Sequence, residues 1–84
     1  MDVKITKDCY VPKENIKFYI SYASNPVKNM VRSMRKQEKI FDFTYGKKIS
    51  SVIYLKSDEL ILTGLTVETL HNRMNATVPV KSST

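Results

Sequence analysis

The sequence predicts a small α+β domain, built mostly from antiparallel strands with one amphipathic central helix and a short C-terminal helix. Two patterns indicate this class. Apolar and polar residues alternate over several short stretches, which is the period of half-buried strands. Residues 27–34, by contrast, carry apolar side chains at the helical spacing i, i+3, i+4 and i+7. Because 84 residues are the length of one domain, both patterns belong to a single fold.

The first part of the chain contains three predicted strands. Val3–Ile5 and a stretch that ends at Val11 are short strands, and the proline and polar residues from Val11 to Asn15 predict a turn. The clearest strand is Ile16–Tyr22. We expect it to have one apolar and one mixed face, because four apolar residues (Ile16, Phe18, Ile20, Tyr22) alternate with Lys17, Tyr19 and Ser21.

Asn25 and Pro26 mark the predicted start of the central helix. An asparagine side chain can cap free backbone N–H groups, and the fixed φ of proline suits the first helical position. The helix is expected to end near Glu38, with an apolar stripe facing the core that consists of Val27, Met30, Val31 and Met34. Basic residues gather on a neighbouring, outward sector, namely Lys28, Arg32, Arg35, Lys36 and Lys39.

The second part of the chain predicts three further strands. Ile40–Tyr45 alternates through Phe41, Phe43 and Tyr45, and Gly46 then starts an exposed loop that contains two lysines. Ser51–Leu55 and Leu60–Thr63 lie on either side of a polar turn, so they predict a hairpin.

A short helix closes the predicted domain. Val67, Leu70 and Met74 have helical spacing, and Thr66 can cap the start. We therefore expect residues 1–74 to form one domain and residues 75–84 to form a loose tail.

The positive charge of the chain is concentrated in one stretch. The net charge is +6, and residues 25–48 alone carry seven basic and two acidic side chains. Such a concentration creates a local positive potential that attracts phosphate or anionic lipid, although a charge run can also be an ordinary solvated surface.

No group of residues has the pattern of a catalytic or metal site. Cys9 and His71 are the only cysteine and histidine in the sequence, and zinc sites draw on several such ligands. We expect Cys9 to act as a small apolar side chain and His71 to lie at a surface or interface without a catalytic partner. The sequence thus predicts no enzyme, no cofactor and no small-molecule substrate. The N-terminus lacks the apolar segment of a signal peptide, so a cytoplasmic location is expected.

The aromatic residues allow two interpretations. Five tyrosines and three phenylalanines could form a stacking platform for single-stranded nucleic acid. The alternation of Phe18, Phe41 and Phe43 with polar residues instead favours core or subunit-interface positions.

The segment from Tyr45 to Lys48 is the most informative local feature. Gly46 permits a sharp turn, after which Lys47 and Lys48 project from the loop with no apolar reason to be there. Ammonium groups on a loop can pair with phosphates without reading bases.

Four segments together resemble the RemA family of bacterial biofilm-matrix regulators: Asn25–Lys28, Asp42–Lys48, Ser57–Leu62, and Val67–Leu70 followed by Arg73. The correspondence extends over residues 15–74 and more loosely from Val3. The resemblance implies a small α+β protein that assembles into a ring and binds DNA upstream of matrix-biosynthesis genes.

The resemblance also implies positions for the DNA contacts. Family arginines in the loop after the Tyr-Gly pair correspond to Lys47 and Lys48, and another corresponds to Asn15, with Lys13 and Lys17 close by. The sequence departs from the family at these positions, since lysine replaces arginine twice, a third basic position is Ser50, and the glycines after the first strand are replaced in Lys7–Cys9. Lysine keeps the attraction to phosphate but loses the bidentate geometry of arginine.

The leading hypothesis is a homo-oligomeric, cytoplasmic, DNA-binding transcriptional regulator of the RemA type, with no membrane partner. Its expected contacts with double-stranded DNA are Lys47, Lys48, Lys13, Lys17, Arg32, Arg35 and Lys36. Two alternatives remain open at this point. The chain could be an RNA-binding module, or an interaction protein whose basic face meets an acidic protein.

Overall fold

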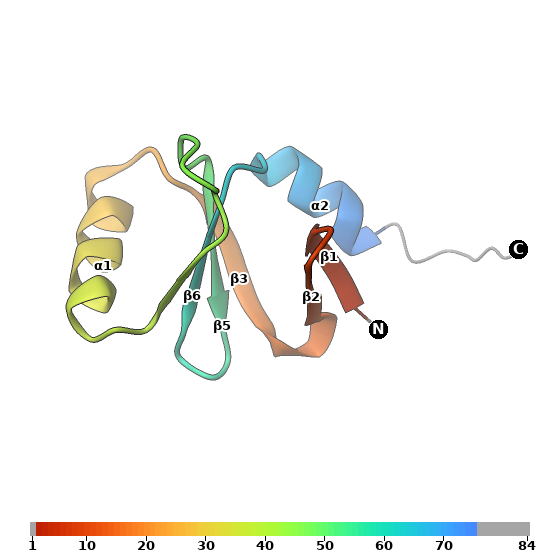
Figure 1. Ribbon diagram of the computed structural model, residues 1–84, viewed down its shortest axis with the longest axis horizontal. Coiled ribbons are helices and arrows are strands. Elements are labelled where there is room, and N and C mark those ends of the chain that lie inside the picture. The colour runs from red at the N-terminus through yellow and green to blue at the C-terminus, as the bar shows by residue number, and fades with distance from the viewer. Residues whose placement is uncertain (1, 76–84) are drawn as a thin grey trace, which may run out of the picture.

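The computed structural model describes residues 2–75, which form the predicted α+β fold (Figure 1). The elements follow in the order β1 (Asp2–Thr6), β2 (Cys9–Pro12), the 3₁₀ turn η1 (Lys13–Asn15), β3 (Ile16–Ser21), α1 (Asn25–Lys36), β4 (Ile40–Asp42), β5 (Ser51–Leu55), β6 (Leu60–Thr63) and α2 (Val67–Asn75). Asn75, which the sequence places in the tail, is the last residue of α2, and residues 76–84 lie outside the described part.

A four-stranded sheet in the order β3-β5-β6-β4 forms the centre of the domain, and β1 and β2 form a separate antiparallel pair. β5 and β6 form the predicted antiparallel hairpin, and β3 also pairs with β5 in antiparallel, whereas β4 pairs with β6 in parallel. Because α1 connects β3 to β4, the hairpin β5–β6 is inserted between two strands that are consecutive in the sequence. The edges of the sheet are therefore β3 and β4.

Both faces of the sheet are covered, and each has its own apolar cluster. α1 packs its predicted stripe on one face, against Val52, Leu60 and Leu62. The β1–β2 pair and α2 cover the opposite face, where Ile53, Ile61 and Leu70 are buried. Figure 1 shows this arrangement, with α1 on one side of the sheet and α2 with β1 and β2 on the other.

The alternation of apolar residues in β3 and β4 did not predict correctly which side chains are buried in the core. Phe18 is 40% exposed, Ile20 is 38% exposed and Phe41 is 45% exposed, whereas Phe43 packs against the cluster beneath α2. The reason is that β3 and β4 are edge strands, so their apolar side chains extend past the elements that cover each face. The core interpretation is correct for Phe43 and wrong, within a single chain, for Phe18 and Phe41.

The ends of α1 differ from the predicted ends. Ser24 occupies the N-cap position, without a side-chain capping bond, and Asn25 is already helical. The helix ends at Lys36, after which Glu38 adopts a positive φ of 57°. The amide of Glu38 donates to the carbonyl of Arg35, and the amide of Lys39 donates to that of Met34. This pattern is a Schellman motif, which ends a helix through a left-handed residue.

Candidate nucleic-acid interface

The predicted loop begins with a tight turn over Thr44–Lys47. The amide of Lys47 donates to the carbonyl of Thr44 at 3.0 Å, and the two central residues, Tyr45 and Gly46, have φ angles of 55° and 80°. Positive φ at both central positions is the signature of a type I′ turn. The turn fixes the direction in which the chain leaves toward Lys47 and Lys48.

The side chain of Asp42 starts this turn and ends β4 three residues earlier than the sequence predicts. One carboxylate oxygen, Oδ1, accepts the Thr44 amide at 2.9 Å and the Thr44 hydroxyl at 2.6 Å. These bonds draw the chain out of the extended conformation, because aspartate competes with strand pairing for neighbouring backbone groups. The hydrogen bonds from Thr44, the hydroxyl bond first, lower the pKa of Asp42, and the positive charge of Arg35 adds to the effect.

The loop is attached to the fold on both sides of the turn. Phe43 packs against the cluster beneath α2, and Ile49 packs against the cluster beneath α1. The backbone of Ser50 completes the attachment, since its amide donates to Thr63 and its carbonyl accepts from Tyr22. The two lysines are therefore presented from a framework that is held at both ends.

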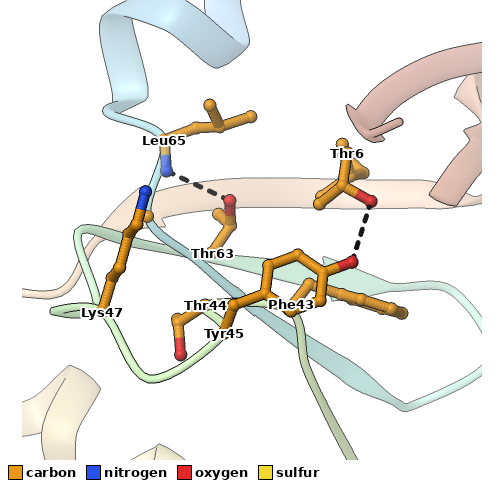
Figure 2. A pocket seen from close by; sticks show the side chains of 9 residues that line it. Thr6, Phe43, Thr44, Tyr45, Lys47, Thr63 and Leu65 are labelled. Atoms are coloured by element: carbon orange, nitrogen blue, oxygen red, sulfur yellow. Dashed lines mark hydrogen bonds between the residues drawn. The ribbon is translucent and has the colours of Figure 1, made fainter. Parts of the chain in front are cut away.

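Lys47 and Lys48 are both exposed, as expected of residues that contact a partner. Lys47 also lines a hollow between the loop and the end of β1 (Figure 2). On the opposite side of that hollow, the hydroxyl of Tyr45 lies 3.4 Å from the hydroxyl of Thr6. No local sequence pattern predicts this contact, because the two residues are 39 positions apart.

The helix cations form a second basic surface. Arg32, Arg35 and Lys36 are exposed, and α1 contains no acidic residue. Arg32 donates to the side chain of Asn29 at 3.0 Å. The positive charge of Arg35 contributes to the lowered pKa of Asp42, the last residue of β4.

Lys13 and Lys17 lie elsewhere in the single chain. They flank Ile16, which pairs with Leu55, whereas the loop joins the other end of β5 at Ser51. Asn15 is at this far end too, since its carbonyl accepts the amide of Lys56 at 2.7 Å. The Nζ atom of Lys17 lies over the ring of Tyr54, 5.4 Å from the ring centroid. In one protomer, Lys13 and Lys17 therefore lie at the opposite end of β5 from the loop lysines.

His71 has partners that the sequence did not suggest. Its Nδ1 lies 3.1 Å from the Tyr19 hydroxyl, and its Nε2 lies 3.2 Å from the side-chain nitrogen of Asn75. The Tyr19 contact ties α2 to β3, the Asn75 contact lies within α2, and both suit a structural role. Cys9 packs against the core, and burial raises the pKa of its thiol. A raised pKa disfavours the reactive thiolate.

The comparison with known families decides the class of this protein. Residues 3–74 match the RemA-like family, described as extracellular matrix regulatory protein A-like. The chain belongs to the RemA-like family. The match covers nearly all of the described fold, including the basic loop and both helices.

Individual relatives agree with this assignment, and each carries a name that assigns it a regulatory role. A protein of Thermodesulfovibrio yellowstonii is 41% identical over 56 residues, which cover 67% of this chain and 66% of the relative. A protein of Moorella thermoacetica is 29% identical over 86 residues, covering 99% of this chain and 94% of the relative. This RemA-like chain is thus a regulatory protein. Over residues 2–75 it contains no helix that is long and apolar enough to cross a membrane.

Proposed function

We propose that this RemA-like chain is a homo-oligomeric transcriptional regulator that binds double-stranded DNA and controls extracellular-matrix genes. In each protomer, Lys47 and Lys48 contact backbone phosphates. Arg32, Arg35 and Lys36 add to the positive field of each protomer.

The observation that carries this proposal is the construction of the basic loop. A type I′ turn and two apolar anchors, Phe43 and Ile49, restrain the loop. Lysines on such a loop lose less conformational freedom on binding than lysines on a mobile segment, and this pre-organisation favours affinity. Contacts of this kind recognise the phosphate backbone rather than base edges, so sequence preference has to arise from DNA shape or from the array of subunits.

The exposed apolar side chains support assembly from identical chains. Phe18 and Ile20 lie at the β3 edge on the α1 face, whereas Phe41 lies at the β4 edge on the α2 face. We call these the β3-edge patch and the β4-edge patch. Because the two patches differ and lie at opposite edges, contact between them joins protomers head to tail, and such contacts form a ring when the rotation between protomers closes. An oligomer would repeat each weak phosphate contact and raise the overall affinity through multivalency.

The decisive experiment replaces both loop lysines with alanine. Lys47→Ala/Lys48→Ala should leave folding and assembly unchanged, because exposed charges contribute little to stability. Duplex affinity should fall sharply, and the dependence of log K on log salt should become shallower by about 0.9 for each phosphate contact removed. Fluorescence anisotropy with a labelled duplex at several salt concentrations measures both quantities.

Lys4→Ala/Lys56→Ala is the matched control, since it removes the same charge from two exposed lysines outside the loop. It should retain most of the affinity. Changing Lys47 and Lys48 to arginine should preserve or strengthen binding, because the guanidinium group suits phosphate geometry. A double-alanine protein that assembles normally and binds duplex with unchanged affinity and salt slope would contradict the proposal.

RNA binding is a second candidate, and one contact favours it. The rings of Phe18 and Tyr54 stack at 5.2 Å with an interplanar angle of 18°, and Lys17 lies over Tyr54. Exposed aromatic residues beside a cation can stack on unpaired bases. Competition between labelled duplex and unlabelled single-stranded RNA separates the two functions, since an RNA module would release duplex at low RNA concentrations.

A further inference from the structure

The hollow between the basic loop and the β1–β2 turn has the size of a site for one small chemical group. Its volume is about 220 Å³, which is below the roughly 300–1,000 Å³ of pockets that hold whole small molecules. None of its nine lining residues, among them Thr6, Tyr45 and Lys47, is acidic. An anion therefore meets no carboxylate on the walls.

Two of the lining hydroxyl groups already have partners. The Thr44 hydroxyl donates to Asp42, and the Thr63 oxygen accepts the amide of Leu65 at 3.1 Å. The Thr63 hydroxyl keeps its proton, but this residue is only 1% exposed. The more accessible donors for a bound group are the ammonium of Lys47 and the hydroxyl pair of Thr6 and Tyr45. Figure 2 shows Lys47 on one side of the hollow and this pair on the other.

The hydroxyl pair always keeps one proton available. Each hydroxyl has a single proton, and one of the two is used in the 3.4 Å contact between Thr6 and Tyr45, in either direction. The Thr6 oxygen also accepts the amide of Asp8 at 3.1 Å, which fixes its position at the end of β1. Whichever hydroxyl donates to the other, the second O–H is free to donate to a ligand oxygen.

From these features we infer that the hollow is a seat for a phosphate-type oxyanion, which accepts hydrogen bonds from Lys47 and from the Thr6–Tyr45 hydroxyl pair. Its occupant is a phosphodiester group of the DNA backbone, so in this form the inference rests on the proposed function. The apolar side chains of Ile5, Phe43 and Leu65 lower the polarity around the seat, which strengthens hydrogen bonds made there. The Thr6–Tyr45 hydroxyl pair carries no charge, so the charge pattern of the sequence does not reveal it.

The test uses the full chain and compares single with double removal of the hydroxyls. Tyr45→Phe and Thr6→Val should each weaken duplex binding little, because the remaining hydroxyl keeps a free proton. The double variant should bind duplex about tenfold more weakly, since a hydrogen bond to a charged group is lost. Its salt slope should equal that of the wild type, because neutral groups displace no counterions.

Two further variants separate a role in binding from a role in folding. Tyr45→Phe/Thr6→Ser restores one hydroxyl and should recover the affinity. Tyr10→Phe/Thr69→Val is the matched control, because it removes a tyrosine and a threonine hydroxyl outside the hollow. Circular dichroism verifies that each variant is folded. Three results for duplex affinity would each contradict the seat. The losses of the two single variants could add up to that of the double variant, the double variant could lose no affinity, or the control could lose as much as the double variant.

Inorganic phosphate distinguishes a free anion from the DNA backbone. If the seat also takes free phosphate, the ion should shift the amide NMR signals of Thr6 and Gly46 more than chloride does at equal ionic strength, and the double variant should lose this difference. If phosphate has no such effect while the double variant still loses duplex affinity, the seat is selective for the backbone phosphodiester. A wild-type chain that binds phosphate in this way but no duplex would refute the proposed function and keep the seat. If removing both hydroxyls changes neither duplex affinity nor the response to phosphate, the seat is refuted, while the proposed function still stands.

Discussion

Tyr45 adopts a backbone conformation that side chains rarely take, with a φ of 55°. The following Gly46 has a φ of 80°, and a Cβ atom built on it would meet nothing within 4 Å. Glycine is therefore needed at this position for its conformation and not for space. The ring hydroxyl of Tyr45 lies 3.4 Å from that of Thr6, so the aromatic side chain connects the turn to the end of β1 as well as lining the hollow.

Asp42 should make the stability of the chain depend on pH in the acid range. Its folded pKa is lowered, so its contribution is fully present above the unfolded value of about 3.9 and is lost as pH falls through the folded pKa. At about pH 7, Asp42→Ala should lower the free energy of unfolding by about 0.5–1 kcal/mol, at the low end for hydrogen bonds because the residue is exposed. Urea titrations of both proteins at about pH 7 and about pH 2.5 measure the difference, which should shrink at the lower pH. An equal difference at both pH values would show that the Thr44 bonds do not depend on the charge.

The basic loop illustrates what could be predicted at the level of residues. Gly46 followed by Lys47 and Lys48 indicated an exposed, cationic turn directly from residue types. The early end of β4 at Asp42 could not be predicted, because alternation continues through Phe43 and Tyr45 while one carboxylate bonds to Thr44. The contact between Thr6 and Tyr45 depends on tertiary packing, which no local pattern encodes.

At the scale of elements, the end of α1 contains a correctable strain. Glu38 occupies the left-handed position of the Schellman motif, where glycine is favoured. Glu38→Gly should therefore raise the free energy of unfolding by about 0.5 kcal/mol, after the entropic cost of glycine is subtracted. Glu38→Ala is the control, since it removes the same charge but keeps a Cβ atom at positive φ. If both variants change the urea midpoint equally, the effect comes from the charge and not from the backbone.

The cationic surface of α1 should act as a field and not through individual contacts. Arg32→Ala or Lys36→Ala alone should weaken duplex binding modestly, because the other helix cations maintain most of the local potential. The effect should decline as salt increases, since exposed charges are screened. Anisotropy titrations at two salt concentrations test this expectation. A loss as complete as that of Lys47→Ala/Lys48→Ala would place the main DNA contact on the helix.

The spacing of apolar residues predicted whether a segment is a helix or a strand better than it predicted where that segment lies in the fold. The stripe of α1 and the β5–β6 hairpin were correct because local spacing determines which side chains share a face. The same alternation in β3 could not reveal that this strand lies at an edge, since edge position depends on the order β3-β5-β6-β4. The insertion of β5–β6 between β3 and β4 is what exposes Phe18 and Phe41.

At the scale of the whole molecule, the chain combines a small core with exposed apolar side chains. A chain of 84 residues buries a limited share of its surface and gains stability from association. Open edge strands with exposed apolar side chains also invite pairing with other chains. Both features predict that the protein is an oligomer at micromolar concentrations. Light scattering that gives a compact monomer of 9.7 kDa would contradict the ring proposal.

Head-to-tail assembly predicts a specific result when two defective proteins are mixed. Phe18→Asp should disable the β3-edge patch and Phe41→Asp the β4-edge patch, and each variant alone should remain monomeric yet folded, because both side chains are already partly exposed. A mixture should form a heterodimer, since one intact patch remains on each partner and the two intact patches are complementary. Further growth is blocked because the outer patches of that dimer are both disabled. Mass measurements on the separate and mixed proteins test this prediction. If each patch instead pairs with its own copy, each variant alone would form a homodimer through its intact patch, and the head-to-tail arrangement would be wrong.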